Sequence, residues 1–293
     1  MLKKLLQSLF LIGLLSIFLA PYSLAENRLV VPQQSSAPTI DGVADEAVWA
    51  NAAELSIVDS ATGKTINLKT FRDDQRIYFL ATYPDADESR LHKPWVWDKE
   101  LELYDLGPQR EDNFAFKWNL EDKPVDLSNF ADNLYRADVW YWKANRTDPV
   151  GYADDKLHIL QDQPGKKAKQ LTSKGGQQRY LIRLGDVGDA AQKKRILVDY
   201  EGDIVDQYES TTPSGSRADV HAKGAWKGGA WTIEFSRLLD TGNDDDIQFD
   251  PSSGKSYQFG VSILGLYAEE IPPGQTPGYG KGRISDPIML EFK

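Results

Sequence analysis

Residues 113–118, with the sequence NFAFKW, decide the fold of this chain. In an extended strand, successive side chains point to opposite faces, so the aromatic rings at positions 114, 116 and 118 share one face. Ala115 and Lys117 share the other face. Large aromatic side chains at every second position are typical of a β-strand that covers a hydrophobic core.

A second strand of the same kind is predicted at residues 137–143, with the sequence ADVWYWK. Here Trp140 and Trp142 share one face, and Tyr141 and Lys143 share the other. A strand with bulky aromatic side chains on both faces is covered on both sides, once by the core and once by a loop, a partner, a sugar or a flat cofactor. The alternative is a wide aromatic core that lies under long loops.

The rest of the chain consists of short apolar or alternating runs between clusters of Gly, Pro, Asn and Asp. Residues 73–75 predict a hairpin turn, and residues 186–194 are expected to form a short helix. We therefore predict an all-β protein, an antiparallel β-sandwich of the immunoglobulin or jelly-roll type with long loops and little helix. The loops are expected at residues 161–178, 202–229 and 268–283. Further strands are expected at residues 66–71, 76–83, 179–184, 195–200, 230–237, 257–266 and 288–292.

The first 25 residues are predicted to be a cleaved signal peptide. Lys3 and Lys4 form a charged start, residues 5–20 are apolar, and residues 23–25 (SLA) form a small-residue cleavage site. Residues 26–293 are expected to form a single domain. We therefore expect an exported, periplasmic protein that has no membrane anchor after cleavage.

Composition excludes several classes of function. The chain has no cysteine, which excludes thiol catalysis, cysteine-held iron–sulfur clusters and covalent c-type haem. The net charge of −10 becomes −12 once residues 1–25 and their two lysines are removed, and such an acidic chain is a poor partner for nucleic acid. The histidine and methionine ligands that remain are His92, His158, His221 and Met289. We expect the last three to be structural.

Residues 39–49, with the sequence TIDGVADEAVW, form a separate motif. The Asp-Gly pair favours a turn, and Trp49 is expected to pack against one end of the sandwich. The motif resembles the start of family-nine carbohydrate-binding modules and of related DOMON-like sandwiches. That resemblance implies the fold but no ligand.

Residues 111–118 (EDNFAFKW) and 137–155 (ADVWYWKANRTDPVGYADD) resemble the ethylbenzene-dehydrogenase-type haem-binding domain. This domain occurs in gamma subunits of molybdenum enzymes of the DMSO reductase class and in stand-alone periplasmic proteins. The resemblance extends from about residue 39 to the C-terminus. It implies a β-sandwich that holds non-covalent haem b and transfers electrons, as a carrier or as the non-catalytic haem subunit of a redox complex. The expected partners are haem and a periplasmic redox enzyme or a c-type cytochrome.

The resemblance also implies iron ligands. The gamma subunits use a Met and a Lys, and the Met lies on the strand that matches residues 113–118, where this chain has Lys117 and no Met. The second ligand lies in a Gly-rich stretch that matches residues 280–283, which makes Lys281 a candidate. His92 is the best histidine candidate, because aromatic residues flank it just before the motif strands.

Each of these ligands has an alternative interpretation. A lysine binds iron only as the neutral amine, so Lys117 or Lys281 needs a desolvated site that lowers its pKa. Otherwise Lys117 is a solvent-facing lysine and His92 is a surface histidine. Two further groups of site residues are expected from residue type and motif position: Lys143 and Arg146 to pair with the haem propionates, and Trp118, Trp140 and Trp142 to line the ring.

Two alternative functions remain at this point. The first is a carbohydrate- or small-ligand-binding module that uses the Trp cluster as a stacking platform. The second is a haem-free member of the family, which a closed, side-chain-filled pocket beside Trp140 and Trp142 would favour. Residues 244–246 (three aspartates) form either a Ca²⁺ ligand set or a solvated hairpin loop, and residues 154–155 are expected to cap a turn or pair with Arg146.

Overall fold

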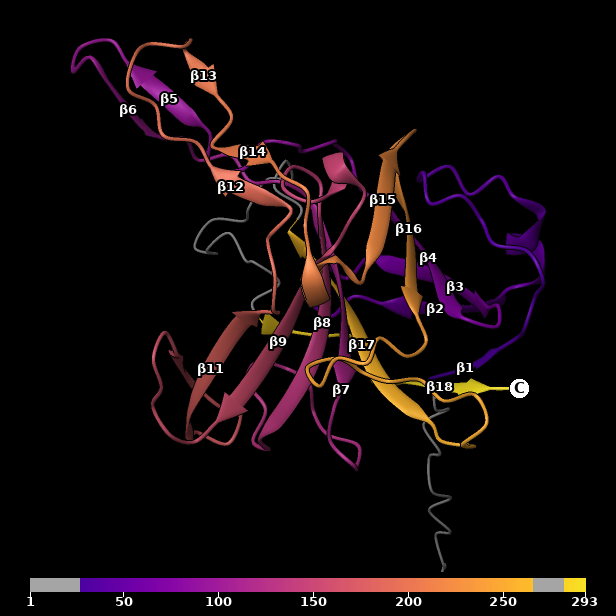
Figure 1. The fold of residues 1–293 in the computed structure, drawn as a ribbon. Helices are drawn as coiled ribbons and strands as arrows, with labels where there is room; N and C mark the ends of the chain where they lie inside the picture. The colour runs from indigo at the N-terminus through magenta and orange to yellow at the C-terminus, as the bar shows by residue number, and fades with distance from the viewer. Residues whose placement is uncertain (1–26, 266–281) are drawn as a thin grey trace, which may run out of the picture.

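The aromatic strands predicted at residues 113–118 and 137–143 lie side by side at the centre of a large sheet (Figure 1). They are β7 (Asn113–Asn119) and β8 (Tyr135–Lys143), and they pair antiparallel. The computed structural model describes residues 27–265 and 282–293. The eight strands of this sheet are, in order, β1 (Asn27–Val31), β18 (Ile288–Phe292), β17 (Tyr257–Gly265), β7, β8, β9 (Asp154–Gln161), β11 (Gln178–Gly185) and β10 (Lys169–Thr172).

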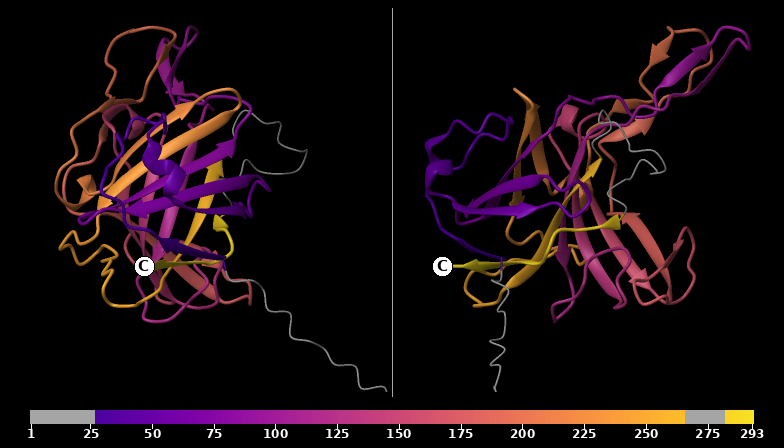
Figure 2. Two further views of the ribbon diagram at one scale, coloured as in Figure 1. Left: turned by 90° about the vertical axis from the view of Figure 1, so that its right-hand side faces the viewer. Right: turned by 180° about the vertical axis from the view of Figure 1, so that it is seen from behind.

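A second sheet packs on the eight-stranded sheet and completes a β-sandwich, as predicted (Figure 2). Its five strands are, in order, β15 (His221–Trp226), β16 (Ala230–Leu238), β4 (Arg76–Pro84), β3 (Thr65–Arg72) and β2 (Ala53–Val58). All strand pairs in the two sheets are antiparallel except β1 with β18. The helical segments within the described ranges are three short 3₁₀ helices: η1 (Ala47–Asn51), η2 (Asp148–Val150) and η3 (Gly215–Ala218). None of the described helices is long and apolar enough to cross a membrane.

An arm of three short strands projects from one corner of the sandwich (Figures 1 and 2). It consists of β5 (Trp95–Asp98), β6 (Leu103–Leu106) and β13 (Ile204–Val205). The pair β12 (Gln192–Lys194) and β14 (Tyr208–Ser210) lies at its base. Trp97 packs within the arm, with its ring 4.9 Å from that of Tyr104 and 5.2 Å from that of Tyr200.

Several local predictions need correction. The helix expected at residues 186–194 is absent, because its last three residues form β12 and pair with β14. Residues 195–200 form no strand, whereas the expected loops at 161–178 and 202–229 contain β10, β13, β14 and β15. β13 is stabilised by pairing with the distant β5, which local sequence does not reveal, whereas β10 and β15 form hairpins with the strands that follow them. The hairpin turn at residues 73–75 is confirmed, since it joins β3 to β4.

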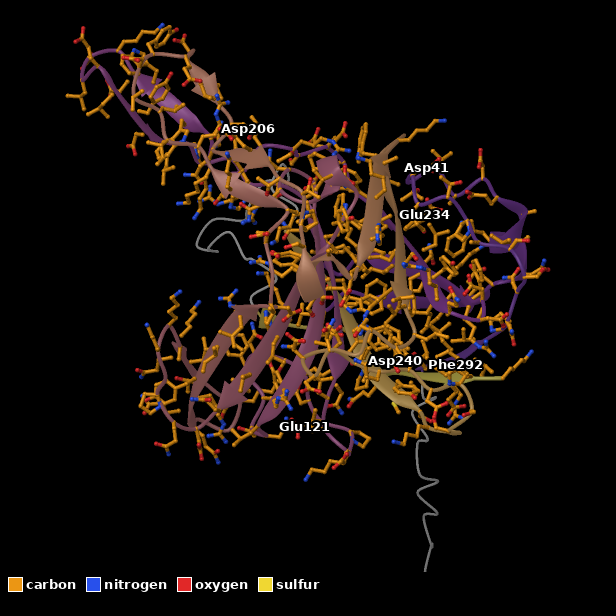
Figure 3. All side chains as sticks on the ribbon, viewed as in Figure 1. Asp41, Glu121, Asp206, Glu234, Asp240 and Phe292 are labelled. Atoms are coloured by element: carbon orange, nitrogen blue, oxygen red, sulfur yellow. The ribbon has the colours of Figure 1, made fainter. Side chains whose placement is uncertain are left out.

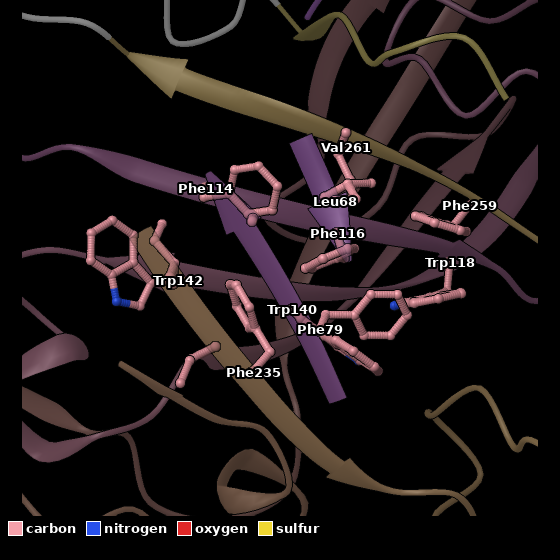
Figure 4. Close-up of a cluster of buried hydrophobic side chains, with 14 of the residues drawn as sticks. Leu68, Phe79, Phe114, Phe116, Trp118, Trp140, Trp142, Phe235, Phe259 and Val261 are labelled. Atoms are coloured by element: carbon pink, nitrogen blue, oxygen red, sulfur yellow. The ribbon is translucent and has the colours of Figure 1, made fainter. Parts of the chain in front are cut away.

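Aromatic side chains fill the space between the two sheets (Figure 4). Trp118, Trp140 and Trp142 are completely buried there. The ring of Trp118 stacks on Phe259 at 4.4 Å, and Trp142 meets Trp231 edge-on at 4.9 Å. The shared face predicted from the alternation in β7 and β8 is therefore the face that covers the core.

Glu234 on β16 fixes the motif at residues 39–49 to the outer face of the five-stranded sheet (Figure 3). Its carboxylate accepts hydrogen bonds from the backbone N–H groups of Asp41 (3.0 Å) and Gly42 (2.8 Å) and from Nε1 of Trp49 (2.9 Å). Trp49 packs edge-on against Phe71 on this outer face. It therefore covers a sheet face and not, as expected, one end of the sandwich.

Gly42 provides a test of this contact. Its φ is +85°, and an added Cβ would lie 2.8 Å from backbone atoms of Gly224 and Ala225. We expect Gly42→Ala to lower the free energy of unfolding by about 2–4 kcal/mol, from backbone strain and crowding together. Gly63→Ala is the matched control, because Gly63 has a φ of +72° but open space around it. The free energy of unfolding of the control, measured with urea, should fall by only about 1 kcal/mol. Equal losses would contradict the close approach at Gly42.

Candidate functional site

A cavity of about 430 Å³ lies on the outer face of the eight-stranded sheet, opposite the core. Its floor is formed by the side chains of β7, β8 and β9 that alternate with the core aromatics, and Ser262 of β17 and Arg183 of β11 extend it. The walls come from loops and short elements, and they include His92, Asn129, Arg146, Gln192, Arg217 and residues 282–284. The cavity size falls within the usual range for small-molecule and cofactor sites.

Lys117 lies in this floor and is 5% exposed. Its Nζ is 2.6 Å from the hydroxyl of Tyr135 and 3.3 Å from Oδ1 of Asn129, and it lies over the Tyr135 ring. Burial lowers the pKa of Lys117 to about 7, and the nearby Arg183 guanidinium acts in the same direction. The amine is therefore held by two neutral partners and is readily deprotonated.

Lys143 belongs to an ion-pair network around Asp154. Asp154 pairs with Lys143, with Lys156 (2.8 Å) and with Arg217 (2.6 Å). Burial alone would raise the pKa of Asp154, but the cations of Lys143 and Lys156 hold it well below its usual range. Burial lowers the pKa of Lys143 to about 7, although the nearby Asp154 carboxylate acts to raise it. The expected ion pair between residues 154–155 and Arg146 is replaced by this network.

Arg146 pairs instead with Glu111, which is fully buried. Glu111 also accepts hydrogen bonds from the backbone N–H groups of Asn145 (2.8 Å) and Arg146 (3.0 Å). His92 lies beside this pair, with its Nδ1 3.2 Å from Oε1 of Glu111. Burial and the Arg146 cation lower the pKa of His92 to about 3. His92 is therefore a neutral imidazole that lines the cavity.

His158 also lines the cavity, although we expected it to be structural. Burial and the Lys117 charge hold its pKa well below the usual value. Its Nδ1 and the hydroxyl of Ser262 are buried and have no hydrogen-bond partner among the described residues. The sequence signal that could have found His158 is its alternation with Asp154 and Lys156 on one strand face.

The sequence-predicted site residues thus divide between two places. Lys117, His92, Lys143 and Arg146 meet at the outer-face cavity. Trp118, Trp140 and Trp142 do not line it, because they point from the same strands into the core. Their surroundings are closed and filled by side chains, which is the arrangement that we associated with a haem-free protein. Lys281 lies outside the described residues.

The other candidates lie apart from this cavity. His221 on β15 packs against the ring of Tyr152 at 4.6 Å. Met289 on β18 lines a larger neighbouring groove of about 1190 Å³. That groove shares Leu127 and residues 283–284 with the cavity. Among the described residues that line it there is no histidine, and the cationic ones are Lys174 and Arg283. Nitrogen donors and cations are therefore concentrated in the smaller cavity.

The donor set of the cavity fits a haem group. An axial ligand must offer a free nitrogen or sulfur lone pair, and Lys117, His92 and His158 offer nitrogen from groups that burial holds neutral or nearly so. Haem carboxylates need cations, and Arg146, Lys156, Arg183 and Arg217 all line the cavity. Asp154 is the one carboxylate in the described lining, and its charge is already paired.

Solved structures similar to this chain include the following three, all of low similarity. Two are structures of a family-nine carbohydrate-binding module from Caldicellulosiruptor kristjanssonii, with glucose (12% identity, 91% of this chain and 96% of that chain, TM-score 0.39) and with cellotriose (12%, 91% and 94%, TM-score 0.40). The third is a putative carbohydrate-binding protein from Bacteroides uniformis (9% identity, 92% and 100%, TM-score 0.40). We draw no argument from scores this low.

Comparison of the sequence is more informative. No curated protein matches the chain significantly. The model of the family described as ethylbenzene dehydrogenase matches residues 45–264, which include β7, β8, β9 and most of the residues that line the cavity. Because this match spans most of the chain, the protein belongs to the ethylbenzene dehydrogenase family.

Proposed function

We propose that the protein binds haem b non-covalently in the outer-face cavity and transfers electrons in the periplasm. It acts as a carrier or as the haem subunit of a redox complex, and Lys117 is an axial ligand. The observation that carries this proposal is the position of Lys117, a buried amine with a pKa of about 7 on the floor of a cation-lined cavity. The chain also belongs to the ethylbenzene dehydrogenase family, and the resemblance of residues 111–118 and 137–155 to its haem-binding domain supports a haem site.

The neighbours of Lys117 suit a ligand amine. A metal-bound amine directs its lone pair to the metal and keeps N–H groups that need acceptors. The Tyr135 hydroxyl and the Asn129 carbonyl oxygen lie within hydrogen-bond distance to accept them. Burial raises the pKa of Tyr135, so that partner stays a neutral hydroxyl. These two side chains orient the amine without protonating it.

The second axial position has two histidine candidates in the described part of the chain. His158 extends from the same face of the sheet as Lys117, and its Nδ1 has no hydrogen-bond partner among the described residues. His92 reaches the cavity from the loop that follows β4. Lys281 remains a prediction from the family pattern. When bound, haem supplies reversible one-electron transfer at iron, and the chain contributes ligands, burial and surrounding charge.

The cationic residues would hold the propionates. We expected Lys143 and Arg146 in this role, but Lys143 is engaged by Asp154 and Arg146 by Glu111. Lys143, Asp154 and Arg146 still line the cavity, together with Lys156, Arg183 and Arg217. Arg146 retains 16% side-chain exposure and stays the better propionate partner of the two, since a guanidinium can bind one carboxylate and still donate to another.

The carbohydrate alternative has weaker support. A stacking platform must be exposed, and the Trp cluster that we considered for it is buried between the sheets. The haem-free alternative rests on the closed surroundings of Trp140 and Trp142. It does not account for a buried lysine and a buried histidine nitrogen that face an open cavity on the other side of the sheet.

Replacement of Lys117 tests the ligand directly. We expect the purified protein to give a Soret band when titrated with haemin, and Lys117→Leu to weaken the affinity at least about tenfold. Lys69→Leu is the matched control, because Lys69 lies on β3 in the other sheet and pairs with Glu54. The absence of a Soret band in the unmodified protein would contradict haem binding. An unchanged affinity and spectrum in Lys117→Leu would contradict the ligand assignment.

The pKa of Lys117 predicts the pH dependence of binding. Protonation removes the lone pair that binds iron, so haemin affinity should fall as the pH drops through about 7, by up to about tenfold per pH unit. The measurement is a series of haemin titrations between pH 5.5 and 8.5 in one buffer series. In Lys117→Leu this dependence should disappear. A flat profile in the unmodified protein would argue against lysine ligation.

The same pKa predicts the stability of the haem-free protein. The pKa of Lys117 falls from 10.5 to about 7 on folding, so between these values the unfolded chain holds a proton that the folded chain lacks, and stability rises with pH. Below pH 7 the lysine is protonated in both the folded and the unfolded chain, so the full free-energy cost of burying its charge remains. Lys117→Leu should therefore stabilise the protein by about 1–3 kcal/mol at pH 6–7, and the gain should shrink toward pH 10. Urea unfolding measures this, and a gain that does not vary with pH would contradict the lowered pKa.

A further inference from the structure

A second group of charged side chains lies on the opposite side of β8 and β9 from the cavity. Asp138 on β8 and Asp155 on β9 point toward the sandwich interior, and Asp246 reaches them from the loop after β16. One oxygen of each carboxylate lies within 4.8 Å of the other two. Asp138 and Asp155 are completely buried, and Asp246 is 4% exposed. The proposed haem site uses none of these groups.

Two of the six carboxylate oxygens of Asp138, Asp155 and Asp246 have conventional partners. Oδ2 of Asp138 accepts hydrogen bonds from the Ile247 backbone N–H (3.0 Å) and from Nε1 of Trp140 (3.2 Å). Oδ2 of Asp246 accepts one from the Thr241 hydroxyl (2.5 Å). These contacts hold two of the carboxylates in fixed orientations.

The remaining oxygens accept no hydrogen bond from an N–H group or hydroxyl of the described residues. They are Oδ1 of Asp138, Oδ1 of Asp246 and both oxygens of Asp155. Asp186, which follows β11 and is 6% exposed, adds two more oxygens of this kind at the edge of the group. Buried carboxylate oxygens without donors are costly, so an unpartnered carboxylate such as Asp155 points to a missing positive partner.

Arg237 on β16 supplies only part of that charge. Its guanidinium lies 3.4 Å from Asp138 and 3.2 Å from Asp246. Four buried carboxylates therefore face one guanidinium. Asp219 and Asp245 lie near the rim, where their oxygens accept hydrogen bonds from Asn243 (2.7 Å) and Ser216 (3.3 Å). Burial and the neighbouring carboxylates raise the pKa of Asp155 well above its usual range and that of Asp186 to about 8.

We propose that Asp138, Asp155 and Asp246 bind a Ca²⁺ ion between the two sheets, with Asp186 beside it. Oxygens that ligate Ca²⁺ lie 2.3–2.6 Å from the ion, so two of them are at most about 5 Å apart, which agrees with the spacing of these carboxylates. The group offers carboxylate oxygen and no nitrogen or sulfur ligand, and such a set selects a hard cation. The ion completes the neutralisation that Arg237 begins.

The ion would add a second tie to the hydrogen bond from the Ile247 N–H to Asp138, which already joins the loop after β16 to β8. Asp138 and Asp155 come from adjacent strands of the eight-stranded sheet, and Asp246 comes from a loop that continues the five-stranded sheet. The ion therefore fastens this loop to β8 and β9. Of the three aspartates at residues 244–246 that we considered as Ca²⁺ ligands, Asp246 faces the group and Asp244 is exposed.

Thermal unfolding with and without Ca²⁺ tests the proposal on the haem-free protein. After treatment with a chelator, Ca²⁺ at about a hundredfold excess over its Kd should raise the Tm by about 5–10 °C. The same concentration of Mg²⁺ should raise it less, because Mg²⁺ demands a tighter octahedral ligand set. Asp155→Asn should abolish the Ca²⁺ effect, whereas the matched control Asp244→Asn in the exposed part of the loop should keep it.

A luminescence measurement locates the ion even if Asp155→Asn folds poorly. Trp140 donates to Asp138, so excitation of this tryptophan should sensitise the emission of bound Tb³⁺, a Ca²⁺ analogue. Added Ca²⁺ should quench that emission by displacing Tb³⁺. No Tm shift with Ca²⁺, together with a Tm that rises as the pH is lowered from 8 to 6, would show that protons alone neutralise the group and would overturn the proposal. A Ca²⁺-induced Tm shift in Asp155→Asn equal to that of the unmodified protein would also overturn the proposal.

Discussion

The packing of Trp118 and Phe116 against Phe79 joins the two sheets. Together with their contacts to Phe259 on the neighbouring strand, it fixes which way β7 faces. Because side chains alternate along a strand, a slip of one residue would exchange Trp118 with Lys117 and place an amine in the aromatic core. The free-energy cost of that exchange fixes the pairing register of β7 with the strands beside it. The outer face is then free to carry groups that no core would accept, and the cavity lies on that face.

Two buried lysines in this cavity have similar pKa values but different surroundings. Lys143 pairs with Asp154, whose other partners are Lys156 and Arg217, so its charge is balanced. Lys117 has two neutral partners, Tyr135 and Asn129, and its desolvation is not compensated by an adjacent carboxylate. A group that costs stability without balancing another charge is typical of a functional site. This difference separates Lys117, as a ligand, from Lys143, as part of the structure.

The alternation in residues 113–118 and 137–143 was sufficient to predict the sandwich and the side chains that share each face. The alternation alone does not show which of the two strand faces lies inside the sandwich. That depends on the side chains that the second sheet packs against it. For this reason Trp140 and Trp142 were assigned to a ligand, while they fill the core. Lys117 was identified because its strand matched a family motif. The alternation of His158 with Asp154 and Lys156 does not by itself show that this face of β9 borders a cavity, because the cavity is formed with neighbouring strands and loops.

The consecutive residues Asp154 and Asp155 connect the two charged regions of the molecule. A strand cannot turn two successive side chains to one face, so Asp154 meets the cations of the cavity and Asp155 enters the carboxylate group inside the sandwich. Each carboxylate is buried, and each needs positive charge on its own side of the sheet. An ion bound at Asp155 would therefore restrain the backbone of β9 from behind. That same backbone sets the position of Asp154, and through it of Lys143, and it carries Lys156 and His158 into the cavity.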